Sequence, residues 1–559
     1  MKTLPFNSRR SSVYGKGGIV ATSQPLATAA GLEILAQGGN AADAAVAAGA
    51  ALNVTEPTST GIGGDMFALF YSADIKRVTA LNGSGRAPAS LTLDRLKKEG
   101  FSSELPPFHA HTVTVPGACA GWFDLIEKHG SLSMAEILAP AIRMAEGGFP
   151  VAPITAKSWQ RGVERQLKSA RNGHELTING RGPNAGEIFR NPGLARTFKT
   201  IAEGGKSAYY QGAIAESIVR VINEAGGCMS ADDLASHAST SEEPISVDYR
   251  GYRVYECPPN GQGITALIAL NILEGFDLAS LVPLSTERMH FMIEAMRLAF
   301  ADSRWYVADP AFSNIPIKEL LSKEYANERR KLIDPKRATI DPKRGTPVNS
   351  SNTVYLSVAD KFGNACSFIN SNYWGFGTGI VPKGWGFTLQ NRGYNFVLDP
   401  EHPNCLAPRK RPYHTIIPAM VTRLPSPTGS PNGVLRKEAE GEVESLYASY
   451  GVMGGFMQPQ GHVQVLSALV DDGLDPQSAL DLPRFCIDVE EAGGEVAIED
   501  GMPPDTVAGL QNLGHPLHSV AGYERALFGR GQVILRDAET GVLGAGSDPR
   551  ADGCAMTLV

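Results

Sequence analysis

Residues Ser351–Ser371 read SNTVYLSVADKFGNACSFINS, and this segment carries the clearest structural pattern in the chain. Apolar and polar side chains alternate over 354–358, which predicts a half-buried strand. The next residues, DKFGN at 360–364, contain Gly and Asn, which tolerate the positive φ of a tight turn. A second strand is predicted over 365–370. The segment therefore predicts a β-hairpin.

The register of this hairpin determines which hydroxyl groups meet. If the hairpin is symmetric about Phe362, Thr353 lies opposite Ser371, with Cβ atoms roughly 5 Å apart. Two hydroxyls at that separation can form a hydrogen bond, whereas a slip of one residue would remove the pairing. A Thr–Ser cross-strand pair is also an ordinary structural feature of sheets. In the same register Cys366 faces away from Ser367, and we expect it in the core.

Thr353 gains a chemical role if the Asn352–Thr353 bond is cut. The new α-amine has a reference pKa of about 7.7–8.0, so part of it is neutral at pH 7. It can then accept the proton of its own Oγ, which makes one residue both nucleophile and base. The hydroxyl of Ser371 is placed to orient that Oγ. The pattern thus allows an N-terminal threonine nucleophile.

Bulk composition narrows the class of protein. The chain has 559 residues, 43% apolar and 19% charged, which is enough for a large core. A net charge of −7 without a long basic run argues against a nucleic-acid partner. The seven cysteines form no CxxC pair, which is typical of reduced thiols. The opening residues, MKTLPFNSRRSS, lack a secretory apolar core, and no apolar run would span a bilayer, so we expect a cytoplasmic protein.

The rest of the chain mixes helices with strands. A short strand is predicted at 17–22, and helices are predicted at 134–146 and 286–301. The last two hundred residues favour short strands broken by Gly and Pro. The polar segment 424–445 is predicted to be a surface insertion. This mixture predicts an α+β fold built of layers.

His109-Ala-His111 has a spacing that a metal ion can use. It lies in a Pro-rich polar segment with no cysteine and no evident acidic partner, so we interpret it as a solvated loop. The segment 60–65 is rich in Gly but lacks the pattern of a phosphate-binding loop. No metal site and no cofactor is therefore predicted.

The chain resembles the γ-glutamyltransferase family of N-terminal-nucleophile hydrolases over nearly its whole length. The likeness is carried by GGNAADAAVAAGAALNVTEPTSTGIGGD, HTVTVPGACAGWFDLIEKHGSLS, PPNGQGITALIALNILEGFDL, EAMRLAFADSRWYVADP, TVYLSVADKFGNACSF, FGTGIV, APRKRP, GVMGGF and GAGSDPR. The resemblance implies a four-layer αββα sandwich, with two stacked sheets between helices. It also implies a precursor that cuts itself at Asn352–Thr353 into a large subunit, 1–352, and a small subunit, 353–559.

The resemblance also implies roles for other residues. The second hydroxyl of the family's site falls on Ser371, in agreement with the hairpin register. Its oxyanion-binding glycines fall on Gly454 and Gly455. Glycines let a carbonyl oxygen approach backbone N–H groups, and a helical pattern follows them, so they would lie near a helix N-terminus. An ordinary glycine turn is the alternative.

Departures from the family concern the substrate pocket. The family's carboxylate-binding Arg falls on Ser84 here, and the nearest guanidinium is that of Arg86. The positions that hold the substrate's ammonium group in the family read Tyr373, Arg392 and Asn395. A buried ammonium facing Arg392 would be strongly disfavoured.

The family's paired serines become His414 and Thr415, where the histidine could donate a hydrogen bond, change charge near neutral pH or simply be packed. These departures fit the acylase branch of the family, which includes some cephalosporin acylases and oxamate amidohydrolase. We expect an amide substrate with a polar or carboxylate-bearing acyl group, bound by Arg86 or Arg392 with the help of Tyr373, Asn395, His414 and Thr415. Water or an amine would then accept the acyl group. Two alternatives stay open: an ordinary γ-glutamyltransferase or glutathione hydrolase with a remodelled pocket, and an uncleaved, non-catalytic binding relative.

Overall fold

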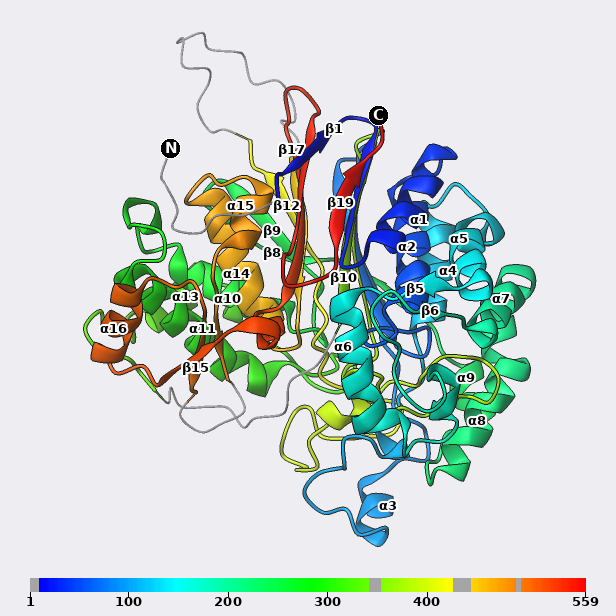
Figure 1. Ribbon diagram of the computed structural model, residues 1–559. Coiled ribbons are helices and arrows are strands. Elements are labelled where there is room, and N and C mark those ends of the chain that lie inside the picture. Colours follow the sequence, from blue (N-terminus) through cyan, green and yellow to red (C-terminus); the bar gives the residue numbers. More distant parts are fainter. Residues whose placement is uncertain (1–9, 341–352, 426–443, 489–493) are drawn as a thin grey trace.

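The computed structural model describes residues 10–340, 353–425, 444–488 and 494–559. Asn352 and all but the ends of the predicted insertion at 424–445 lie outside the described residues. Two seven-stranded sheets lie side by side in the middle of the molecule, with helices to either side (Figure 1).

The first sheet is built around the hairpin predicted above. Strands β10 and β11 pair in the predicted register, which includes Val354 opposite Asn370 and Ser357 opposite Ser367. That prediction is confirmed. The strand order of the sheet is β19 (Cys554–Thr557), β2 (Gly18–Thr22), β10 (Val354–Asp360), β11 (Ala365–Ser371), β3 (Asp65–Ser72), β4 (Arg77–Gly83) and β7 (Thr240–Glu242).

The second sheet packs its inner face against β10 and β2 of the first. Its strand order is β1 (Val13–Gly15), β18 (Leu543–Ser547), β17 (Arg530–Arg536), β13 (Ser445–Met453), β12 (Ala419–Arg423), β9 (Tyr252–Glu256) and β8 (Ile245–Tyr249). Smaller sheets pair β5 (Phe149–Pro150) with β6 (Ile188–Phe189), and β14 (Phe485–Ile487) with β15 (Val496–Glu499) and β16 (Leu517–Val520).

Helices cover the outer face of each sheet (Figure 1). Those on the side of the first sheet include α1 (Pro25–Ala36), α2 (Ala41–Thr55), α4 (Ala118–His129), α5 (Met134–Gly147), α7 (Pro192–Tyr210) and α8 (Ala213–Glu224). Those on the side of the second include α10 (Gly263–Leu273), α11 (Thr286–Tyr306), α13 (Lys323–Arg330), α14 (Met457–Val470), α15 (Pro476–Asp481) and α16 (Pro504–Asn512). Shorter helices are α3 (Leu93–Lys98), α6 (Pro153–Gly162), α9 (Ala231–Ala235) and α12 (Ile317–Leu320). The helices predicted at 134–146 and 286–301 correspond to α5 and α11.

Helix α2 explains why β10 is more buried than predicted. All of its residues are buried, and its alanines let it lie close against β10 and β11. Its N-terminus is closed by a capping box between Asn40 and Asp43. Strand β10 is therefore buried on both faces, by α2 and by the second sheet, and the prediction of a half-buried strand was wrong.

The side chains of Tyr355 and Ser357 on β10 face the second sheet rather than water. Tyr355 and Ser367 share a hydrogen bond of 2.8 Å, and the hydroxyl of Ser357 lies 2.6 Å from that of Ser449 on β13. Thr353 has the same parity as Tyr355 and therefore belongs to this inner face. Cys366, on the opposite parity, is buried in the apolar core as predicted.

The interpretation of the 109–111 segment as a solvated loop was wrong. A 3-10 helix, η1 (Ala110–Thr112), forms there, and His111 is buried. Its Nε2 lies 2.5 Å from a carboxylate oxygen of Glu99, and its ring packs edge-on against Phe101. A helix that precedes the segment supplied the acidic partner, which spacing alone did not reveal.

Candidate active site

Thr353 lies at the start of β10, and its hydroxyl contacts two polar side chains. Thr353 Oγ1 is 3.1 Å from Ser371 Oγ, at the end of the neighbouring strand β11. The carboxamide of Gln458, in the first turn of α14, reaches Thr353 Oγ1 at 3.5 Å. All three residues are buried. The hairpin register thus brings together the two hydroxyls that sequence analysis paired.

Arg392 joins this group from a separate loop. Its Nη2 donates to Ser371 Oγ at 3.1 Å, and its Nη1 donates to Thr415 Oγ1 at 2.7 Å. The guanidinium lies over the ring of Tyr373, 4.5 Å from its centroid. Burial lowers the pKa of Arg392 to about 10, so the group remains a cation at neutral pH. We refer to Thr353, Ser371, Arg392, Thr415 and Gln458 as the Thr353 cluster.

Tyr373 and Asn395 lie beside Arg392. Tyr373 has a φ of 77°, a left-handed conformation that is uncommon for a bulky residue. Its N–H donates to Ser371 Oγ at 2.9 Å, and its hydroxyl donates to Asn395 Oδ1 at 2.5 Å. Arg392 and Asn395 open and close the same 3-10 helix, η5 (Arg392–Asn395). Within the described part of the chain, the buried Arg392 Nε and Asn395 Nδ2 have no hydrogen-bond partner.

A buried carboxylate, Asp65, supports the cluster from β3. Its Oδ2 accepts a hydrogen bond from His414 Nε2 at 2.9 Å, and its Oδ1 accepts from Gln390 Nε2 at 3.0 Å and from the N–H of Gly85 at 2.9 Å. Burial pushes the pKa of Asp65 up, but the hydrogen bond from His414 and the charge of Arg392 together lower it below its ordinary value. Asp65 is therefore an anion that balances the buried charge of Arg392.

His414 is neutral in this setting. Burial, and then the charge of Arg392, lower the pKa of His414 to about 3. Of the roles considered for this residue, the structure supports a hydrogen-bond donor and argues against a change of charge near neutral pH. Thr415, the next residue, anchors Arg392 as described above.

Gly454 and Gly455 lie between β13 and α14. Both have positive φ values, 137° and 61°, which explains the need for glycine. The carbonyl of Gly455 accepts a hydrogen bond from Gln262 Nε2 at 2.8 Å, which fixes the turn. Neither glycine N–H donates a backbone hydrogen bond to the described residues. Gln458, in the following helical turn, connects this turn to the Thr353 hydroxyl.

Arg86 is not brought into the Thr353 cluster. It is partly exposed, and its Nη1 donates to the carbonyl of Ala238 at 3.4 Å. It lines a cavity of ≈ 410 Å³ together with His237, Thr240 and Arg409, none of which belongs to the cluster. Of the two arginines predicted to bind substrate, the structure places Arg392 next to the candidate nucleophile and Arg86 elsewhere.

Asp65 and Gln458 are site residues that sequence analysis missed. Asp65 ends the GIGGD motif, which we treated only as a glycine-rich turn. The pairing of β11 with β3 places Asp65 directly opposite Ser371. An acidic residue at that position in the sheet was the feature that could have indicated its role. Gln458 follows the glycine pair by one helical turn, and helical periodicity would have placed it on the same side.

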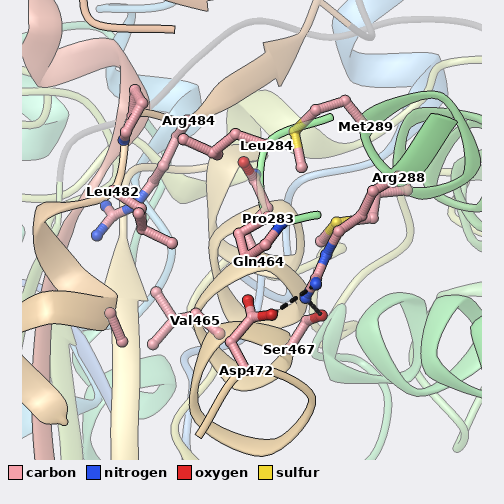
Figure 2. Close-up of a pocket in the computed structure, with 14 residues that line it drawn as sticks. Pro283, Leu284, Arg288, Met289, Gln464, Val465, Ser467, Asp472, Leu482 and Arg484 are labelled. Atoms are coloured by element: carbon pink, nitrogen blue, oxygen red, sulfur yellow. Dashed lines mark hydrogen bonds and ion pairs between the residues drawn. The ribbon is translucent and has the colours of Figure 1, made fainter. Parts of the chain in front are cut away.

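Other hollows and clusters lie apart from Thr353. Figure 2 shows a pocket between α11, α14 and α15 in which Arg288 pairs with Asp472 at 2.7 Å and donates to Ser467 at 2.9 Å. Its volume of ≈ 20 Å³ holds no more than about one water molecule.

A cluster with metal-compatible side chains, His290, Glu294 and His515, is buried beside α11. His290 Nε2 already donates to a carbonyl, that of Asp334, at 2.8 Å, and its Nδ1 lies 2.8 Å from His515 Nε2. Arg297 also lies 3.9 Å from the carboxylate of Glu294, where its positive charge opposes a bound cation. We interpret the cluster as a hydrogen-bonded network within the core.

The described geometry can be compared with known proteins. A family model described as gamma-glutamyltranspeptidase matches residues 27–558. The chain belongs to the γ-glutamyltranspeptidase family. This γ-glutamyltranspeptidase-family chain is similar to the solved cephalosporin acylase from Bacillus halodurans, with 46% identity, a TM-score of 0.89, and coverage of 100% of this chain and 99% of that one. Its fold is accordingly the one shared by the γ-glutamyltranspeptidases and acylases of the N-terminal-nucleophile class.

Two curated relatives indicate the branch within the γ-glutamyltranspeptidase family. The chain is 37% identical over 551 residues to the glutathione hydrolase-like YwrD proenzyme of Bacillus subtilis (strain 168), covering 98% of this chain and 99% of the relative. It is 29% identical over 552 residues to the oxamate amidohydrolase proenzyme of Klebsiella pneumoniae subsp. pneumoniae, with coverage of 98% and 99%. The predicted resemblance to the acylase and amidohydrolase branch is confirmed. None of the described helices of this family member is long and apolar enough to cross a membrane.

Proposed function

We propose that this chain is a self-processing amide hydrolase or acyltransferase whose nucleophile is Thr353. Cleavage at Asn352–Thr353 would yield a large subunit, 1–352, and a small subunit, 353–559, that together form a four-layer αββα sandwich. The observation that carries the proposal is the 3.1 Å contact between the hydroxyls of Thr353 and Ser371 at the end of the hairpin. The proenzyme names of its relatives support the processing step.

The reaction would begin at Thr353 Oγ. The free α-amine of the cleaved residue takes the Oγ proton, and the oxygen attacks the amide carbonyl. The N–H groups of Gly454 and Gly455 stabilise the oxyanion, and this role is supported by their lack of a backbone acceptor among the described residues. The amine leaves with a proton, an acyl ester remains on Thr353, and water or a second amine releases the acyl group.

Arg392 would keep the nucleophile in place and read the substrate. Two of its nitrogens hold Ser371 and Thr415, which fixes the hydroxyl that orients Thr353. Its Nε and the Nδ2 of Asn395 are buried donors without partners among the described residues, and they are suited to an acyl group with a carboxylate or carbonyl oxygen. The names of the cephalosporin acylase and the oxamate amidohydrolase support an amide substrate of this kind.

Two other functions are weaker on specific grounds. An ordinary γ-glutamyltransferase must bind an ammonium group, and the buried cation Arg392 would repel it. An uncleaved binding protein has no need for a second hydroxyl and a glutamine in contact with the hydroxyl of one buried threonine. One relative is named glutathione hydrolase-like, so the first alternative needs a direct test.

A substrate panel on purified protein tests the proposal. We expect turnover of glutaryl and oxamate-type amides, with γ-glutamyl anilide and glutathione much slower. Fast, selective turnover of the γ-glutamyl compounds would support the ordinary transferase instead. A denaturing gel reports on processing: two fragments of 352 and 207 residues are expected, and a single full-length band after long incubation at neutral pH would favour the binding protein.

A further inference from the structure

A second candidate site lies at the cavity beside Arg86, which we call the Arg86 cavity. Its volume of ≈ 410 Å³ falls in the range of about 300–1,000 Å³ that small-molecule sites occupy. The loop after β4 contributes Arg86, the segment from the end of α9 to the first residue of β7 contributes His237 and Thr240, and later loops contribute Phe312 and Arg409. Four segments that are distant in sequence therefore converge on one hollow.

The cavity carries positive charge without a matching counter-ion. Among the described residues, neither Arg86 nor Arg409 has a carboxylate oxygen within 4.0 Å. The acidic residue in the wall is Asp233, and both of its oxygens are already used. Oδ1 accepts from the N–H of Ala89 at 2.8 Å, and Oδ2 accepts from Ser230 at 2.9 Å and 2.7 Å, where it caps α9. Two cations and one hydrogen-bonded carboxylate thus line the hollow, so the charges of its lining arginines and acid do not cancel.

Buried polar atoms without a hydrogen-bond partner among the described residues also lie on and behind the wall of the Arg86 cavity. Arg411 is buried behind the wall, where it donates to Thr240 Oγ1 at 3.0 Å and to the carbonyl of Ser84 at 3.1 Å. Its Nη2, like His237 Nε2 and Ser239 Oγ, is buried without a partner in the described part of the chain. Unpaired buried polar atoms are costly, so a bound anion would relieve an existing penalty.

The wall also has an apolar part. Phe312 is 47% exposed, which is unusual for a phenyl ring, and the ammonium group of Lys410 lies 5.6 Å from its ring centroid. A ligand that places an apolar body on this ring and an anion near Arg86 and Arg409 would match both features of the cavity.

We propose that the Arg86 cavity binds the carboxylate of a small organic acid with an apolar or planar body. Arg86 and Arg409 supply the counter-charge, and Phe312 covers the apolar part. The carboxylate can come from either of two sources: one end of an amide substrate or product, or a free acid that binds independently of turnover. Binding does not depend on the reaction proposed for Thr353.

Calorimetric titration of the Thr353→Ala chain with phenylacetate tests the site, because this variant holds the cavity whether or not the native chain is processed. We expect measurable binding that weakens by about tenfold or more in Arg86→Gln and in Arg409→Gln. Arg77→Gln is the matched control, because Arg77 is an exposed arginine on the adjoining β4 that pairs with Glu243 at 2.6 Å. Neutral phenylacetamide, of similar shape, should bind about tenfold more weakly than the acid.

Equal binding of the acid and the amide, or unchanged affinity in both Arg→Gln variants, would overturn the proposal. Thermal melting of each variant separates lost binding from lost folding. With the active protein, phenylacetate that raises KM alone assigns the carboxylate to the substrate. An effect on kcat at saturating substrate assigns it to a free acid.

Discussion

Arg392 and Arg86 place the same guanidinium group in opposite surroundings. Arg392 is buried, stacks on Tyr373, and donates to two hydroxyls next to Thr353, with the anion Asp65 nearby to balance its charge. Arg86 is partly exposed at the edge of a cavity and has no ion pair among the described residues. A cation that donates to two hydroxyls of its own protein positions those neighbours and keeps only its Nε for a substrate, whereas a cation without an ion pair can turn its whole guanidinium to a ligand. Substitutions around the two arginines should therefore differ in their effects.

Removing the nucleophile should have the largest effect. We expect Thr353→Ala to abolish self-cleavage and amide turnover, because Thr353 is the cluster hydroxyl that would have its own freed α-amine as a base. The Arg86 cavity should keep its affinity for phenylacetate in the same variant. Gel analysis and a turnover assay give the first result, and calorimetry gives the second. Residual cleavage at the wild-type rate would show that another residue initiates processing.

Asp65→Asn should strongly destabilise the fold, because it leaves the buried cation Arg392 without its counter-charge. We expect the free energy of unfolding to fall by about 3–5 kcal/mol, measured by urea denaturation of the Thr353→Ala chain. Asp248→Asn is the control, since Asp248 forms an exposed pair with Arg253 and should change stability by no more than about 1 kcal/mol. Similar losses of unfolding free energy in both variants would mean that Asp65 stabilises the fold no more than an exposed acid does.

Arg392→Lys keeps the charge but loses the two-pronged contact with Ser371 and Thr415. We expect kcat to fall by roughly 10²-fold with a smaller change in KM, because the hydroxyl that orients Thr353 is no longer fixed. Steady-state kinetics on the processed protein measures both constants. A rise in KM with kcat unchanged would show that Arg392 binds substrate without positioning the nucleophile.

Acidification should reduce stability through His414. The pKa of His414 is depressed to about 3 in the folded protein, against about 6.5 in the unfolded chain, so the unfolded state binds more protons between these values. Stability is therefore fully present above pH 6.5 and declines as pH falls toward 3, by up to about 1.4 kcal/mol per pH unit for one group. His414→Gln should flatten this slope in urea titrations of the Thr353→Ala chain. An unchanged slope would contradict the assignment of a neutral histidine.

Arg86→Gln should have the smallest effect on chemistry. We expect kcat on an uncharged amide to stay within about twofold of the native value, because Arg86 touches none of the cluster residues. Turnover of an acetamide-type substrate checks this outcome. A hundredfold loss of kcat would place Arg86 in the catalytic machinery together with Arg392.

Sequence patterns predicted the site where it depends on local pairing. The alternation along 354–358 and the turn at 360–364 were sufficient to set Thr353 against Ser371, because a hairpin register is decided within one short segment. The position of the glycine pair just before a helix was also predictable from the sequence. The relative burial of the strand was not, because it depends on α2 and the second sheet, whose packing no local pattern reveals.

Sequence patterns could not separate the two arginines. Arg86 and Arg392 both belong to loops, and which loop converges on the end of β11 depends on the pairing of strands distant in sequence. Asp65 was missed for the same reason, since its position opposite Ser371 requires β3 to lie next to β11. His111 was misjudged because its partner, Glu99, approaches from another element.

Both large sheets contain strands from each side of the proposed cut. In the first sheet, β10 and β11 of the small part lie between β2 and β3 of the large part, and in the second sheet β12 pairs with β9 across the same division. Strands of the two pieces alternate within the same sheets. Breaking the one peptide bond would therefore leave the hydrogen bonds between the strands intact. We expect the nicked protein to travel as one particle in gel filtration and to come apart only in denaturant, with either fragment insoluble when expressed alone.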